Sequence, residues 1–265
     1  MLTVETQSVP AAAGRGPSAL ACRSNGGHGS DVGKLIEVHR RALRSLADWM
    51  PYLTANSGLP GPRGNLELVA ACGEEADARR AAELIATGGE FATVCGTVAL
   101  GRLYGEGDDR HVVRLHLSAS DQRWRVREGA AMAIQRAADT DPERGFALAE
   151  LWATDPDPLV RRAAVAAVCE PRLLRDAAYA DRALDLLGAV TRDLASRPSE
   201  ARRLAGWRTL RQALGYGWSV AVAAAPVAGI AAFGRIGLID DADVQWIIRE
   251  NRKKSRLKKL LDHLG

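Results

Sequence analysis

Apolar residues along most of this chain recur three or four positions apart, which is the spacing of an amphipathic α-helix. The first such stretch begins at Lys34, where Leu35, Val38 and Leu46 fall on one side of a helix. Nowhere do apolar and polar residues alternate over a run long enough for a convincing strand. We therefore predict an all-α protein.

Short breaks divide this pattern into a series of helices. Each break carries a Gly, a Pro or an Asp, residues that end one helix or cap the next. Pro51 is expected to end the helix that begins at Lys34, and Asn65 to cap a helix from Leu66 to Cys72. The helices expected after these two span residues 74–87, 90–104, 109–118, 123–138, 142–153, 158–169, 179–196, 199–214, 216–225, 227–237 and 241–262.

One segment of the chain occurs twice. The sequence from Asp121 to Ile134, DQRWRVREGAAMAI, is matched 34 residues later by DPDPLVRRAAVAAV, from Asp155 to Val168. The matching pairs are Asp121 with Asp155, Val126 with Val160, Arg127 with Arg161, Ala130 with Ala164, Ala133 with Ala167 and Ile134 with Val168. Self-similarity at this period marks a helical unit that buries its apolar face by stacking on copies of itself. We therefore predict an α-solenoid, which offers a curved surface rather than a pocket.

Two further stretches carry parts of the same pattern. Val94, Cys95 and Val98 hold the small apolar positions between residues 91 and 100. In DADVQWIIREN, residues 241–251, an Asp precedes Val244 by three positions, as it does in the second copy. In this pattern Asp caps the second helix of a repeat, Val begins its buried stripe, and Ala lets neighbouring helices approach closely.

The repeat pattern bounds the domain organisation. Residues 1–32 are rich in Gly, Ala and Ser, so we expect a disordered leader or residues upstream of the true translation start. We expect residues 33–265 to form a single elongated domain that ends in a basic C-terminal helix. Residues 212–234 carry no charge, but Pro226 and several glycines favour two buried helices over a membrane span. With no secretory signal, we predict a cytoplasmic protein without a membrane partner.

Composition changes this picture little. Apolar residues make up 47% of the chain but aromatic residues only 5%, so Ala and Leu carry the burial, which suits close-packed helices. The formal net charge of +4 is compatible with a polyanionic partner without requiring one. The four cysteines are widely spaced and form no C-x-x-C pair, so we expect reduced and mostly buried thiols.

The D-x-x-V and V-R-x-A-A-x-x-A patterns resemble HEAT repeats, the two-helix units of right-handed armadillo-type solenoids. Two C-terminal stretches extend this resemblance. LGYGWSVAVAAAP, residues 214–226, and DVQWIIRENRKKSRL, residues 243–257, resemble a bacterial HEAT-repeat family described by fold alone. That family is similar in architecture to the HEAT-like alkylpurine DNA glycosylases. Those enzymes hold DNA along a basic concave face and place an Asp between aromatic side chains. The local candidates here are Trp124 with Asp121 and Trp246 with Asp243; neither pair reproduces that pattern, so the resemblance implies the shape alone.

Basic residues suggest where a polyanion would bind. Residues 249–259, RENRKKSRLKK, hold seven Lys or Arg against one Glu. These cations would either bind phosphates or form the solvent-exposed surface of a terminal helix that caps the solenoid. Arginines at the starts of second helices would either pair with Asp121, Asp155 and Asp157 in a ladder or contact phosphates. The candidate binding residues are Arg125, Arg127, Arg161, Arg162, Arg249, Arg252, Lys253, Lys254, Arg256, Lys258 and Lys259.

The remaining candidate residues point away from metal or cofactor chemistry. His111 and His116 lie five apart, which does not suit a helical metal pair, and the chain has no His-Glu dipeptide of the kind that HEAT-repeat iron enzymes use. P-loop, dinucleotide-binding and nucleophile-elbow motifs are absent from the sequence. The six tryptophans are expected in the core, with stacking on a nucleobase as the alternative. We therefore expect no metal and no cofactor.

Two functions fit these observations. The first is a non-enzymatic HEAT-repeat scaffold that binds a protein or nucleic-acid partner on its curved face. The second is an alkylpurine DNA glycosylase-like repair protein, or an inactive relative, that binds double-stranded DNA. Such an enzyme needs a carboxylate near the sugar to stabilise positive charge as the glycosidic bond breaks, and aromatic side chains beside the damaged base. Asp121 and Trp124 are the candidates for these roles.

Overall fold

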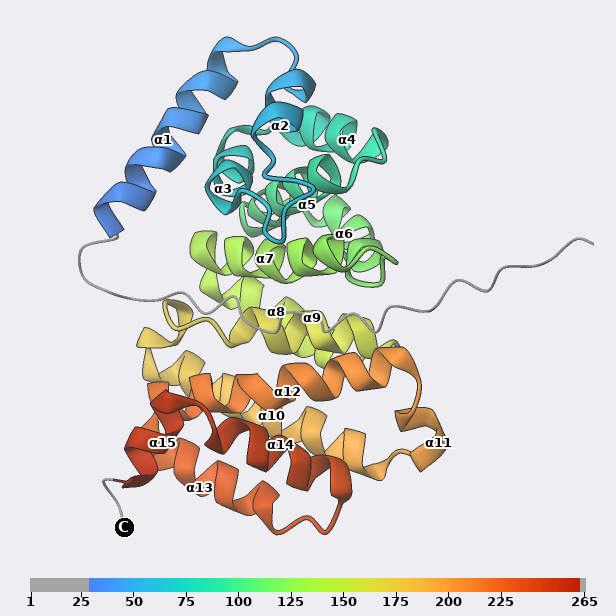
Figure 1. Cartoon of the computed structure of the whole chain (residues 1–265), viewed down its shortest axis with the longest axis vertical. Helices are drawn as coiled ribbons and strands as arrows, with labels where there is room; N and C mark the ends of the chain where they lie inside the picture. Colours follow the sequence, from blue (N-terminus) through green and yellow to red (C-terminus); the bar gives the residue numbers. More distant parts are fainter. Residues whose placement is uncertain (1–28, 263–265) are drawn as a thin grey trace, which may run out of the picture.

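The computed structural model describes residues 29–262, and within this range every regular element is helical, as predicted (Figure 1). Two short 3-10 helices, Asp109–His111 and Leu173–Arg175, accompany the α-helices. The α-helices are α1 (Gly29–Ser45), α2 (Met50–Asn56), α3 (Leu66–Glu75), α4 (Ala78–Ala86), α5 (Glu90–Gly105), α6 (Val112–Ala119), α7 (Trp124–Thr140), α8 (Pro142–Ala153), α9 (Pro158–Val168), α10 (Ala177–Ser196), α11 (Ser199–Arg202), α12 (Ala205–Ala224), α13 (Pro226–Gly237), α14 (Ala242–Arg252) and α15 (Ser255–Asp262).

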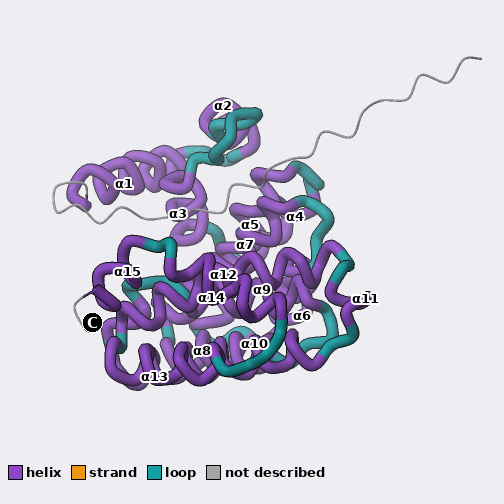
Figure 2. The backbone as a smooth tube through the Cα atoms, turned by 60° about the horizontal axis from the view of Figure 1, so that its bottom comes forward, coloured by secondary structure: helices purple, strands orange, loops and turns teal. Residues whose placement is uncertain are grey.

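The helices pack in two layers. Helices α3, α5, α7, α9, α12 and α14 form the first layer, in which each helix packs against the next. Helices α4, α6, α8, α10 and α13 form the second layer, and each packs against a first-layer helix. Figure 2 shows α8, α10 and α13 of the second layer lying along one side of α9, α12 and α14. In this part of the molecule the second layer therefore covers one side of the first layer.

The two copies of the repeated segment make the same local hydrogen bonds. Oδ1 of Asp121 and Oδ1 of Asp155 each accept a hydrogen bond of 2.8 Å from the backbone N–H two residues later. Arg127 and Arg161 each donate to the backbone carbonyl of the aspartate in their own copy. The matched apolar positions are also buried alike, at 2% exposure or less: Val126, Ala130, Ala133, Ile134, Val160, Ala164, Ala167 and Val168. The turns and the buried apolar positions of the two copies are therefore equivalent.

Small residues let the first-layer helices approach closely. A Cβ atom added to Gly101 in α5 would lie 2.1 Å from the carbonyl oxygen of Ala133 in α7, which is less than van der Waals contact. The same pair of helices meets again one turn later, where Gly105 abuts Ala137. The third predicted partial copy lies in α5, where Val94, Cys95 and Val98 are buried. Close packing of α5 on α7 therefore depends on Gly and Ala.

Several predicted helix boundaries are wrong in the first half of the chain. Pro51 does not end a helix but lies in the first turn of α2, where the missing N–H of proline costs no hydrogen bond. The helix before it already ends at Ser45. The helix predicted over residues 74–87 is interrupted, because the side chain of Asp77 caps α4 by accepting from the backbone of Arg80. The predicted cap at Asn65 is confirmed, with a bond of 2.9 Å from Leu68.

Two predicted boundaries are wrong in the second half. Helix α11 ends at Arg202, and α12 then runs unbroken through Gly215, where a break was expected. The basic C-terminal helix predicted over residues 241–262 is divided into α14 and α15 by a turn at Lys253 and Lys254. The break at Pro226 is confirmed, and Asp241 caps α14 as predicted by accepting from the backbone of Asp243 and Val244.

The N-terminal boundary also differs from the prediction. Helix α1 begins at Gly29, so residues 29–32 are helical rather than part of a leader. The predicted disorder of residues 1–28 lies outside the described residues. Among the residues that the structure describes, no helix has the length and apolar character needed to cross a membrane.

The described cysteines are free thiols in the core, as predicted. Cys72, Cys95 and Cys169 are buried and form no disulfide, whereas Cys22 lies outside the described residues. Burial raises the pKa of the Cys169 thiol to about 12 and the pKa of the Cys95 thiol well above its usual value. Within residues 29–262 no three His, Cys, Asp or Glu side chains gather as a metal site would require.

Candidate functional site

Trp124 is the tryptophan that lies most open to solvent. All six tryptophans fall within the described residues, and four of them are buried in the core as predicted: Trp49, Trp152, Trp207 and Trp218. Trp246 is half-buried, whereas Trp124 at the start of α7 is 40% exposed. Part of the Trp124 ring is therefore accessible to a ligand, whereas the four core tryptophans are enclosed.

The Trp124 indole is held in place by its neighbour Arg125. The guanidinium of Arg125 lies over the indole ring, 4.5 Å from the ring centroid. Two further contacts hold Arg125, an ion pair of 3.0 Å to Glu90 of α5 and a hydrogen bond of 3.1 Å to the carbonyl of Gly61. Because α5 and the loop before α3 both restrain the guanidinium, it favours one position of the indole beneath it.

Glu128 lies one helical turn after Trp124, so the carboxylate and the indole share a face of α7. Arg162 of α9 donates to Oε1 of Glu128, and the side chain of Glu128 remains 28% exposed. Arg162 also reaches the backbone carbonyl of Arg127, at 3.5 Å. The site therefore combines an exposed aromatic ring, a half-exposed carboxylate and a cation from the next helix of the first layer.

Asp121, the predicted carboxylate, is engaged in hydrogen bonds within the turn before α7. Arg123 donates to both its carboxylate oxygens, at 2.9 Å through Nε and 2.7 Å through Nη2. The hydrogen bonds from Arg123 hold the pKa of the Asp121 carboxyl below its usual range. Asp121 thus organises the turn before α7, and both its carboxylate oxygens accept hydrogen bonds, whereas Arg162 bonds only one oxygen of Glu128.

The second predicted pair, Trp246 with Asp243, is also engaged. Asp243 accepts hydrogen bonds from Arg202, at 2.9 Å, and from Arg211. The same Arg211 lies over the Trp246 ring, 4.5 Å from its centroid. The Asp243 carboxylate therefore pairs with two cations, and the Trp246 indole is half-buried between α12 and α14.

Arginines link successive repeats as predicted, but through other acids than the expected Asp121, Asp155 and Asp157. Arg123 pairs with Asp121, whereas Arg161 pairs with Asp193 of α10. Arg161 is 4% exposed and stacks on Trp207, which places it in the core rather than on a phosphate-binding surface. Of the candidate arginines at the starts of α7 and α9, Arg125, Arg127 and Arg162 remain half-buried beside Trp124 and Glu128.

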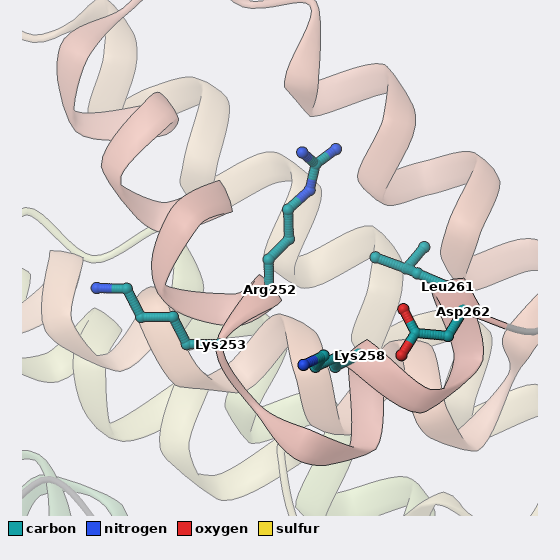
Figure 3. Close-up of a pocket in the computed structure, with 5 residues that line it drawn as sticks. All are labelled: Arg252, Lys253, Lys258, Leu261 and Asp262. Carbon is teal, nitrogen blue, oxygen red and sulfur yellow. The ribbon is translucent and has the colours of Figure 1, made fainter. Parts of the chain in front are cut away.

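The C-terminal candidates occupy the two sides of the turn between α14 and α15. Arg252, Lys253 and Lys258 line an open hollow of about 580 Å³, together with Leu261 and Asp262 (Figure 3). Lys254 and Arg256 instead contact Tyr216 of α12. The remaining two candidates, Arg249 and Lys259, are exposed on α14 and α15.

Glu128 was not among the candidate residues named from the sequence. It stands 34 positions before Arg162, which is the spacing of the two copies, so the two residues are equivalent members of successive repeats. Equivalent positions of stacked helices lie side by side. Opposite charges at one repeat position therefore signalled an ion pair, and Trp124 four residues earlier marked the exposed end of that face.

A family model matches the part of the chain that contains these residues. The family model described as DNA alkylation repair enzyme matches residues 68–205, from α3 to the start of α12. The match includes Trp124, Glu128 and Arg162 but not α14 or α15. No curated protein and no solved structure matches the chain.

Proposed function

We propose that this chain removes alkylated purines from double-stranded DNA. It belongs to the DNA alkylation repair enzyme family, because the family model matches just over half of its 265 residues. The observation that carries the proposal is the juxtaposition of Trp124 with Glu128 and Arg162 on adjacent first-layer helices. This combination supplies the two groups that the chemistry needs, an aromatic surface for the base and a carboxylate for the sugar.

The reaction breaks the bond between C1′ of the deoxyribose and a ring nitrogen of the base. An N3- or N7-alkylated purine carries a positive charge, so it leaves as a neutral base and takes the bonding electron pair with it. Positive charge then develops on the sugar, where a fixed carboxylate stabilises it more strongly than water would. Water adds to C1′ and releases a proton, which leaves an abasic site.

The residues of the site have distinct roles in this proposal. Trp124 stacks on the damaged base, and Arg125 keeps the indole in position from its other side. Glu128 provides the carboxylate in place of Asp121, and Arg162 fixes the orientation of that carboxylate. No metal or cofactor takes part in this chemistry.

The architecture supports the same proposal. Six first-layer helices pack in series, and the two sequence copies have matching hydrogen bonds, which supports a solenoid of HEAT-like repeats, for which we propose a right-handed superhelix. The first layer then forms the concave face along which double-stranded DNA lies. The family match favours this DNA-repair function over the non-enzymatic scaffold, which remains the alternative. A cytoplasmic location also remains a prediction.

The test is release of 7-methylguanine from methylated double-stranded DNA in single-turnover reactions. We expect release by the wild-type protein and a loss of roughly 100-fold in rate for Glu128→Gln, because one preorganised charge interaction in a transition state is worth about that much. Glu150→Gln is the matched control, since Glu150 pairs with Arg182 in an equivalent ion pair of the second layer.

The outcomes separate the two functions. If the wild-type protein releases no base at high protein concentration, the glycosylase proposal is wrong and the scaffold alternative gains support. If Glu128→Gln and Glu150→Gln both release base at the wild-type rate, a glycosylase is present but Glu128 is not its carboxylate.

A further inference from the structure

A surface of positive charge lies at the turn between α14 and α15, outside the part of the chain that the family model matches. We call it the C-terminal basic surface and define it by Arg249, Arg252, Lys253 and Lys258. Arg252 ends α14 and Lys258 lies in the middle of α15, so the turn brings cations of two helices to one hollow (Figure 3). A single unbroken helix would have spread the same charges along its length.

The turn that creates this surface is anchored in the protein interior. Leu257 of α15 is fully buried, and so is Asn251 of α14. The side chain of Asn251 accepts from the backbone of Ser219 at 2.8 Å and donates to the carbonyl of Leu214 at 2.8 Å, both in α12. The two helices are therefore attached to the first layer, and the cations between them have a defined arrangement.

Few carboxylates balance these cations. Glu250 pairs with Lys253, and Asp262 lines the hollow. For Arg249, Arg252 and Lys258, the described part of the chain provides no ion pair. The surface thus keeps an excess of positive charge that the fold itself does not use, unlike the arginines at the starts of α7 and α9.

The geometry favours an extended polyanion over a small anion. Figure 3 shows the side chains of Arg252 and Lys253 pointing in different directions, with Lys258 on the side of Arg252 that faces Asp262, so the three cations do not converge on one point. Cations that diverge in this way suit successive phosphates along a strand. A membrane surface fits less well, because an interfacial helix needs an exposed apolar face, whereas Leu257 is buried and Leu260 packs against the core.

We propose that the C-terminal basic surface binds the phosphate backbone of double-stranded DNA, away from the base that is removed at Trp124. This inference rests on the proposed function, because that function supplies double-stranded DNA as the partner. The surface adds affinity without base specificity, since phosphate contacts carry no sequence information. It would hold the flanking duplex while the first layer engages the damaged nucleotide.

The test measures the affinity for undamaged double-stranded DNA as a function of salt concentration. We expect the double variant Arg252→Glu with Lys258→Glu to reduce the slope of log affinity against log salt by about 1 to 2, because each phosphate contact contributes roughly 0.9. The matched control is Arg114→Glu with Arg235→Glu, which reverses two exposed cations on the second-layer helices α6 and α13. Arg252→Gln with Lys258→Gln repeats the test without added negative charge if the first variant does not fold.

The result can fail independently of the enzyme activity. If the Glu and the Gln double variants of Arg252 and Lys258 both keep the wild-type slope, this inference is wrong. It is also wrong if these variants lose only binding to anionic lipid vesicles. If the wild-type protein binds DNA with the expected slope difference between variants but releases no 7-methylguanine, the surface is supported and the proposed function fails. If the wild-type protein releases 7-methylguanine but the variants keep the wild-type slope, the proposed function is supported and the inference about the C-terminal basic surface is wrong.

Discussion

Tryptophan side chains show how residues of one type are divided between structure and function. Trp218 is fully buried, and its indole N–H donates to Thr191 at 3.1 Å, so its polar atom is satisfied within the core. Trp124 has no comparable burial, and its ring is covered by the charged group of Arg125 instead. The free energy that each ring contributes to folding should differ accordingly.

We predict that Trp124→Ala lowers the free energy of unfolding by less than about 1 kcal/mol, whereas Trp218→Ala lowers it by about 3 to 5 kcal/mol. The difference arises because a cavity forms only where the removed ring was enclosed. Urea denaturation followed by circular dichroism measures both values. Trp124→Ala should nevertheless slow 7-methylguanine release; an equally large loss of stability in both variants would show that Trp124 is a core residue.

Helix packing depends on which glycines touch a neighbouring helix. Gly101 in α5 faces the backbone of α7, and a Cβ atom there would lie 2.1 Å from the carbonyl oxygen of Ala133. Gly234 in α13 has no atom within 4 Å of the same position. Both glycines lie inside helices, where Ala is intrinsically favoured over Gly.

Alanine should therefore have opposite effects at these two positions. Gly234→Ala is expected to raise the free energy of unfolding by about 0.5 to 1 kcal/mol, because it removes the conformational cost of glycine. Gly101→Ala is expected to lower it by roughly 1 to 3 kcal/mol, because α5 and α7 must separate. Thermal and urea midpoints of both variants test this, and a stabilised Gly101→Ala variant would mean that the contact relaxes freely.

An ion-paired carboxylate and a partly buried histidine make the free energy of unfolding depend on pH. Arg44 and Arg40 of α1 both hydrogen-bond Glu75 of α3, which lowers the pKa of the Glu75 carboxyl below its usual value. Burial lowers the pKa of His39, which contacts Tyr52 at 2.8 Å. In both cases the folded protein binds a proton less readily than the unfolded chain does, so both groups stabilise the fold at neutral pH.

We therefore predict that the free energy of unfolding falls as the pH is lowered. The contribution of His39 is lost first, as the pH falls below its ordinary pKa of about 6.5, and the contribution of Glu75 follows below about 4.5. Urea titrations between pH 7 and pH 3 measure this loss. Glu75→Gln should flatten the acidic part of the profile, whereas Glu83→Gln, which replaces an exposed acid of α4, should leave it unchanged.

The whole molecule also shows where the sequence was sufficient for the candidate site and where it was not. Trp124 and Arg162 could be named from the sequence because they stand at notable repeat positions. Glu128 could not be preferred over Asp121 on spacing alone, because both acids lie near Trp124. The choice required knowing that Arg123 bonds both oxygens of Asp121, whereas Arg162 bonds one oxygen of Glu128 from the next helix.

The sequence by itself determined the helical class, the internal repeat and most helix ends, because periodicity, capping by Asp and breaks at Pro act over a few residues. It also determined which Ala and Val positions are buried, since Val126 and Val160 are equivalent members of the same pattern. Only the tertiary structure decided the turn at Lys253 and Lys254, which carries no residue that breaks helices. Burial of Leu257 and Asn251 against α12 fixes that turn, and contacts between distant segments leave no local signal in a sequence.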